Sequence, residues 1–199
     1  MAATKPATAA PERTPVVILF AETRGFTRMS EILQPPVVLA QTCAFFALAR
    51  AAVERQGGTV RNVLNDTLMA SFAGGRHAQQ AVQAAQEIQL EFAAVEDRWA
   101  RDFGIRAAVA IGLHAGDAVI GAADEASGAP LIIGDSVSIA ERLLHRARAG
   151  EFVLSKPVMD ALAAGGFALD AEALPPLEIP RREPIGLYGV LRDTRLDFT

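Results

Sequence analysis

Cysteine, basic charge and long apolar runs are all scarce in this 199-residue chain. The single Cys43 has no partner for an internal disulfide, and its apolar neighbours predict a small buried thiol in a helix. The 19 basic and 23 acidic residues give a net charge of −4, which provides no basic surface for nucleic acid. No uninterrupted apolar run approaches the roughly 18 residues of a membrane span. These scarcities favour a cytoplasmic domain without a nucleic-acid or membrane partner.

The length and composition predict one globular domain with short tails. A chain of 199 residues is of single-domain size, and 51% hydrophobic with 21% charged residues is typical of globular proteins. The Ala-, Thr- and Pro-rich start predicts a flexible tail over 1–14. The domain is then expected over 15–192, with a C-terminal tail over 193–199.

Apolar spacing predicts a mixed sheet covered by helices, an α+β sandwich. The continuous apolar run Val16 to Ala21 predicts a buried strand. Asn65-Asp66 lies between two β-type runs and predicts a tight hairpin, and Gly116-Asp117 predicts a second hairpin. A loop is expected around 127–130. Helices are expected over 26–33, 35–56, 78–99, 135–148 and 156–164, and further strands over 152–155, near 177 and over 186–191.

Two carboxylates are expected at one edge of this sheet. Glu22 ends the first strand, and Asp66 lies at the tip of the first hairpin. Such a pair suits a divalent metal ion that bridges phosphate oxygens. The backbone N–H groups of Gly25, Phe26 and Thr27 would open a helix, which favours anions. The alternative is a chance pair in which Asp66 is a turn residue and Glu22 a strand-end cap, and spacing by itself favours that alternative.

Four segments of the sequence favour the metal site over the chance pair, because they resemble segments of a known family. In order, LFAETRGFTRMSE, GGTVRNVLNDTLMASF, AVAIGLHAGDAVIGA and LIIGDSVSIAERL resemble the signature segments of class III adenylate/guanylate cyclase catalytic domains. The resemblance covers about Val16 to Leu162. It implies a ferredoxin-like sheet flanked by helices and a head-to-tail homodimer with active sites at the interface. It also implies Mg²⁺ or Mn²⁺, and attack of the ribose 3′-hydroxyl on the α-phosphate of a nucleoside triphosphate.

The resemblance assigns catalytic and metal-binding roles by position. Asp66 matches the second metal-binding aspartate, and Arg142 matches the arginine that stabilises the transition state. Glu22 stands where the first metal-binding aspartate is expected. Ser138 stands where an asparagine is expected. Ser138 and Arg142 are spaced i, i+4 and therefore share a helix face.

The resemblance also assigns substrate-binding positions. Asn62 replaces a base-contacting lysine, and Leu131 replaces its Asp or Thr partner. A triphosphate-binding lysine is replaced by Ile179-Pro180, with Arg181 and Arg182 just beyond. On the helix of Arg142, the expected apolar stripe comprises Val137, Ala140, Leu144 and Ala147.

These departures predict a degenerate active site. Loss of one preorganised transition-state donor costs about 2.7–4 kcal/mol, and Mg²⁺ requires near-octahedral geometry that the longer Glu22 disturbs. We expect a weakly active or inactive domain that acts by dimerisation or contact with a regulatory protein. The alternatives are an active cyclase with unusual base preference, including uridine or cytidine triphosphate, and a nucleotide sensor without turnover.

Phe92 and Trp99 are expected in the core or an interface, and His114 is expected to be structural.

Overall fold

The computed structural model describes residues 13–122 and 130–192. Within these ranges the strands are β1 Arg13–Arg24, β2 Thr59–Leu64, β3 Thr67–Ala73, β4 Ala108–Ala122, β5 Pro130–Ile133, β6 Glu151–Ser155, β7 Glu172–Leu177 and β8 Ile185–Leu191. The helices are α1 Phe26–Ile32, α2 Pro35–Arg55, α3 His77–Phe103, α4 Asp135–Arg146 and α5 Lys156–Ala164. β1 begins two residues before the expected start of the domain.

All described strands belong to one mixed sheet. Its order is β2-β3-β1-β4-β6-β8-β7, and β5 pairs with β4. Every neighbouring pair is antiparallel except β4 with β6, which is parallel. The expected α+β architecture and the hairpin at Asn65-Asp66 are therefore confirmed.

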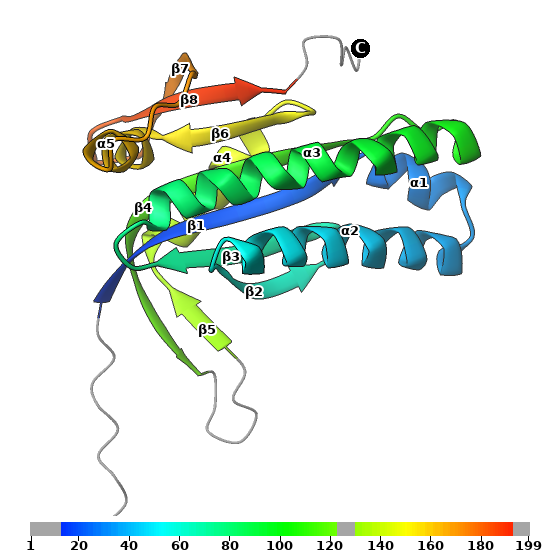
Figure 1. Ribbon diagram of the computed structural model, residues 1–199, viewed down its shortest axis with the longest axis horizontal. Helices are drawn as coiled ribbons and strands as arrows, with labels where there is room; N and C mark the ends of the chain where they lie inside the picture. Colours follow the sequence, from blue (N-terminus) through cyan, green and yellow to red (C-terminus); the bar gives the residue numbers. More distant parts are fainter. Residues whose placement is uncertain (1–12, 123–129, 193–199) are drawn as a thin grey trace, which may run out of the picture.

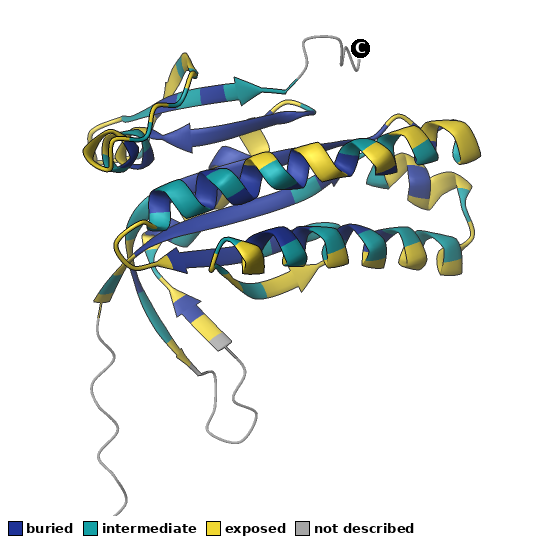
Figure 2. Ribbon diagram, viewed as in Figure 1, coloured by how far each residue is buried: buried dark blue, intermediate teal, exposed yellow. Residues whose placement is uncertain are grey.

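The apolar run of β1 is continuous because both faces of this strand are covered (Figures 1 and 2). Side chains alternate between the faces of a sheet. Val17, Leu19 and Ala21 belong to the core under α2 and α3. Val16, Ile18 and Phe20 belong to the second core, which faces α4. Even-numbered residues of β1 therefore lie on the face that packs against α4.

Helices α2 and α3 lie side by side over the first face (Figure 1). Phe92 stacks edge-on against both Phe45 and Trp99, and all three rings are buried. The expected core positions of Phe92 and Trp99 are confirmed. Cys43, in contrast, is exposed, because it lies on the side of α2 opposite to buried Phe45 and Ala49.

By length and composition, α2 is apolar enough to cross a membrane, although core helices of water-soluble proteins meet the same test. Gln41, Thr42 and Arg50 interrupt its apolar sequence, so α2 contains no uninterrupted apolar run of that length. Five residues of α2 are buried, and the helix packs on α3, β2 and β3.

The predicted hairpin at Gly116-Asp117 is wrong. β4 is one strand of 15 residues that runs straight through both positions. The reason is the length of β1, which pairs with β4 continuously from Arg13 opposite Val119 to Arg24 opposite Ala108. β4 instead pairs antiparallel with β5, and the two extend beyond the rest of the sheet (Figure 1). The loop expected at 127–130 lies outside the described residues, apart from Pro130, which begins β5.

Candidate active site

Glu22 and the Asp66 turn meet at one edge of the sheet, as predicted. Glu22 lies opposite Thr67 in the β1–β3 register, and the Thr67 hydroxyl donates to its carboxylate at 3.5 Å. The Thr23 N–H donates to the backbone carbonyl of Asp66 at 3.4 Å. Asn65 has a φ of 54°, which is the left-handed conformation that a tight hairpin turn requires. The turn therefore places the two acidic residues next to each other.

The proximity of Glu22 affects the pKa of Asp66. Burial raises the pKa of the Asp66 carboxyl, and the nearby charge of Glu22 raises it further. The backbone hydrogen bond of Asp66 and the charge of Arg24 act in the opposite direction. Two neighbouring carboxylates are able to attract a shared cation.

Arg24, which the sequence analysis did not single out, joins the carboxylate edge to α4. Its guanidinium forms an ion pair with the Glu22 carboxylate. The other terminal nitrogen donates to the carbonyls of Leu144 and Ala147, at 3.1 Å each. The i, i+2 spacing from Glu22 was a usable signal, because it puts both side chains on one face of a strand.

Helix α4 carries Ser138 and Arg142 on its exposed side, as expected. The Arg142 guanidinium donates to the Glu178 carbonyl at 3.0 Å, which ties α4 to the segment after β7. In the described part of the chain, no hydrogen bond or ion pair joins Ser138 or Arg142 to Glu22 or Asp66. The predicted apolar stripe needs correction, because Val137 is only half-buried. The buried apolar residues of the helix are Ile139, Ala140, Leu143 and Leu144.

A cavity of about 460 Å³ lies beside Asn62, between α4 and the strands β1, β2 and β3. Phe20, Met69 and Val137 provide apolar walls, and Asn62 lies among the polar lining residues. Glu141, which the sequence analysis overlooked, also lines this cavity. Leu131 does not line it. That residue is 40% exposed on β5, opposite Gly121.

Gly25 shapes the start of α1. Its φ of 100° lies in the range that favours glycine, and a Cβ there would lie 2.5 Å from the Arg106 carbonyl oxygen. Phe26 begins the helix with a half-buried side chain, whereas Thr27 is exposed. The predicted helix start is confirmed. Any phosphate contact of these three residues stays a prediction.

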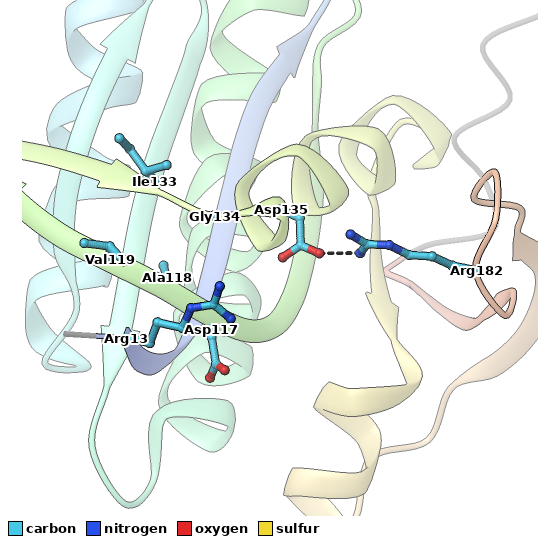
Figure 3. Close-up of a pocket in the computed structure, with 8 residues that line it drawn as sticks. All are labelled: Arg13, Asp117, Ala118, Val119, Ile133, Gly134, Asp135 and Arg182. Carbon is cyan, nitrogen blue, oxygen red and sulfur yellow. Dashed lines mark hydrogen bonds and ion pairs between the residues drawn. The ribbon is translucent and has the colours of Figure 1, made fainter. Parts of the chain in front are cut away.

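A second cavity has a volume of about 570 Å³ (Figure 3). It is lined by the start of β1, the second half of β4, the end of β5 and the start of α4, together with Arg182. Arg182 forms an ion pair with Asp135, and its hydrogen bond holds the pKa of Asp135 below the usual range. Arg13 and Asp117 lie on the opposite wall. Arg181 is exposed with a φ of 64° and does not line this cavity. Its predicted phosphate contact therefore stays a prediction.

The carboxylate edge is suited to a metal ion that a nucleotide helps to hold. In the described residues, no three His, Cys, Asp or Glu side chains form a metal cluster. Two carboxylates are nevertheless sufficient for Mg²⁺ when phosphates and waters supply the other ligands. Glu22 and Asp66 would be the protein ligands, with Arg24 in contact with one of them. Mn²⁺ accepts the same carboxylate oxygens.

A comparison with known protein families identifies the class of this domain. The family model described as "Adenylate and Guanylate cyclase catalytic domain" matches residues 8–188 of the chain. The chain therefore belongs to this family.

Known proteins similar to this chain include cyclases of both base specificities. An adenylate cyclase from Anabaena cylindrica is 30% identical over 133 residues, which are 64% of this chain and 26% of that protein. The chain thus matches about a quarter of that relative's length. The adenylyl cyclase CyaB from P. aeruginosa superposes with a TM-score of 0.82 at 21% identity, covering 94% of this chain and 98% of that one. The guanylyl cyclase Cya2 has a TM-score of 0.78 at 22% identity, covering 90% and 92%. The structural likeness shows the fold.

Proposed function

We propose that this domain turns over ATP and GTP weakly or not at all with Mg²⁺, and acts as a dimerising regulatory module in cyclic-nucleotide signalling. The main support is the ion pair between Glu22 and Arg24, which engages one of the two expected metal ligands. Ser138 also supports the proposal, because its side chain is shorter than that of the asparagine expected at this position in the family. A bound metal ion would offset phosphate charge and orient the triphosphate. Arg142 would then be the remaining side chain able to stabilise charge on the α-phosphate.

A homodimer is part of this proposal. Among the described residues, no hydrogen bond or ion pair joins Glu22 or Asp66 to Ser138 or Arg142, whereas a head-to-tail pair would bring the carboxylate edge of one copy to the Ser138–Arg142 face of the other. Leu64 is 66% exposed and Ile133 is 61% exposed, on the strands that α4 leaves uncovered. Light scattering at micromolar concentration should give the mass of two chains, and a monomer would contradict a two-chain site.

The decisive test is product formation from all four ribonucleoside triphosphates, with Mg²⁺ and with Mn²⁺. The wild type should form little cyclic nucleotide. The quadruple variant Glu22→Asp, Asn62→Lys, Leu131→Asp, Ser138→Asn should gain activity toward ATP. The gain is expected to be partial, because Ile179-Pro180 still lacks a phosphate-binding lysine and effects within one site do not add. Robust wild-type turnover that vanishes in Asp66→Ala would contradict the proposal.

One observation favours an active cyclase with unusual base preference as the second candidate. The Asn62 amide and the Glu141 carboxylate line one cavity, and together they offer hydrogen-bond donors and acceptors to a base. Glu141→Gln would remove an acceptor for base amino groups while keeping the shape. Under this candidate, the variant should change the ranking of the four triphosphates. Tight nucleotide binding in calorimetry without any product would instead favour the sensor.

A further inference from the structure

Arg24 is held in place from two sides by contacts within the chain. One terminal nitrogen pairs with Glu22, and the other donates to Leu144 and Ala147. The side chains of Arg24 and Glu22 are only 28% and 17% exposed. Partial burial reduces screening by water and salt, so this pair is stronger than an ordinary surface ion pair.

The position of Arg24 follows from the strand and from the helix that it reaches. Residues 22 and 24 lie on the same face of β1, which is the face toward α4. Leu144 and Ala147 lie at the C-terminal end of α4, where the last carbonyl oxygens lack the usual partner four residues on, although the Ala147 N–H donates to the Leu144 carbonyl at 3.1 Å. The negative end of the helix dipole favours a cation there. The guanidinium is therefore anchored by α4 independently of Glu22.

This anchored cation changes the charge of the carboxylate edge. Glu22 and Asp66 carry two negative charges, and Arg24 offsets one of them. A metal ion that binds Glu22 must share the carboxylate with the guanidinium or displace it. An opposite charge within about 4–6 Å of a carboxylate favours its charged form by a factor of about ten or more. Competition for a metal ion acts through the same Coulomb interaction.

We propose that Arg24 is a positioning residue that acts as a tethered counter-ion of Glu22. It keeps the carboxylate ordered when no metal ion is bound, and it weakens the binding of free divalent ions to the edge. The inference rests on the proposed role of Glu22 and Asp66 as the metal pair. It does not require that the domain turns over any nucleotide.

The test is direct Mn²⁺ binding without nucleotide, measured by electron paramagnetic resonance of the free ion. Arg24→Gln removes the charge and keeps a donor for the α4 carbonyls, so Mn²⁺ should bind about tenfold more tightly than to the wild type. Arg24→Lys keeps the charge and should stay closer to the wild type than to Arg24→Gln. Arg28→Gln is the matched control, because Arg28 is an exposed cation on α1 that pairs with Glu31 at 3.6 Å. Its charge is screened by solvent, and its removal should change the affinity by no more than about twofold.

A second substitution shows whether Glu22 carries the effect. Glu22→Gln combined with Arg24→Gln should lose the gain seen in Arg24→Gln. The proposal is overturned if Arg24→Gln binds Mn²⁺ no more tightly than the wild type, or if Arg28→Gln gains as much. It is equally overturned if the double variant keeps the gain, or if none of the proteins binds Mn²⁺. Cyclic-nucleotide formation, which tests the proposed function, is not part of this measurement.

Folding of the variants is checked by circular dichroism. If Arg24→Gln does not fold, the wild-type protein decides the question through the Arg24 side-chain N–H resonance during a Mg²⁺ titration. A shift that follows the signal of the Glu22 carboxyl carbon supports the proposal. An Arg24 resonance that stays unmoved while Mg²⁺ binds at Glu22 overturns it.

Discussion

The two faces of the sheet differ in how far helices cover them. The first face lies under α2 and α3, which are 21 and 27 residues long. Of the described helices, only α4 packs on the second face. It is 12 residues long and contacts β1, β4 and β6. β2 is mostly exposed, and Phe20 and Met69 border a cavity that Val137 and Glu141 of α4 also line.

The candidate chemistry is found on the less covered face. Glu22, Arg24 and Asn62 lie beside or beyond the edge of α4, whereas the first face holds the aromatic cluster around Phe92. Close packing stabilises the first face, and incomplete cover on the second leaves room for a ligand or another chain. The predictions below test this division of roles.

The largest effect is expected for a core ring on the covered face. Phe92→Ala should lower the free energy of unfolding by about 3–5 kcal/mol, because the buried ring leaves a cavity between Phe45 and Trp99. Leu64→Ala, on the open face, should lower it by no more than about 0.5 kcal/mol. Urea denaturation of both variants measures the contrast. Equal losses would show that the open face is packed as tightly as the covered one.

A pH effect of up to about 3 kcal/mol is expected from His114, which is buried on the α4 face. Its Nδ1 lies 2.8 Å from the Ser155 hydroxyl, and burial lowers the pKa of His114 to about 4 against a smaller opposing effect of Asp135. The unfolded chain takes up this proton near pH 6.5 and the folded chain near pH 4. The unfolded state therefore binds more protons in this window, and stability falls as the pH is lowered from about 7 to 4.

The measurement compares wild type with His114→Gln in urea denaturation at several pH values between 7.5 and 4.5. The variant should lose less stability on acidification than the wild type. Carboxylates contribute to both curves and cancel in the difference. Parallel curves for the two proteins would show that His114 is not held neutral by the fold.

Gly112→Ala should lower the free energy of unfolding by about 1–3 kcal/mol. Gly112 lies on β4 under α4, and an added Cβ would overlap the backbone of the helix at Ala140 and Leu144. Gly121→Ala is the control on the same strand, because nothing lies within 4 Å of its Cβ position. Thermal unfolding should separate the two variants. Similar midpoints would mean that α4 does not need this close approach.

The smallest effect on the folded monomer is expected at the exposed surface. Leu64→Ser should change the free energy of unfolding by no more than about 0.5 kcal/mol, yet raise the dimer dissociation constant by about tenfold. Leu90→Ser is the matched control, because Leu90 is 72% exposed on α3 over the other face. Sedimentation equilibrium measures the dimer dissociation constants of the Leu64→Ser and Leu90→Ser variants. A weaker dimer in Leu90→Ser alone would place the interface on the covered face.

The family and most of the helices and strands could be predicted from the sequence, because these depend on local patterns. The exceptions are β4, which was predicted as a hairpin, and β5, which was not predicted. The apolar run after Thr14, the Asn65-Asp66 turn and the long amphipathic stretch before Trp99 each specify one element through side-chain periodicity and turn chemistry. The placement of Glu22 and Asp66 at one edge also followed, because a hairpin next to a strand fixes which ends meet.

Long-range packing decided the rest. Gly116-Asp117 has the composition of a turn, but pairing with the full length of β1 keeps β4 extended. Cys43 has apolar neighbours in the sequence, yet its helix face points outward. The contact of Arg24 with Leu144 and Ala147 spans more than 100 residues, and Glu141 reaches the Asn62 cavity only because α4 crosses β1. Such contacts depend on where elements that are far apart in the sequence pack against one another. Local periodicity carries no information about this packing.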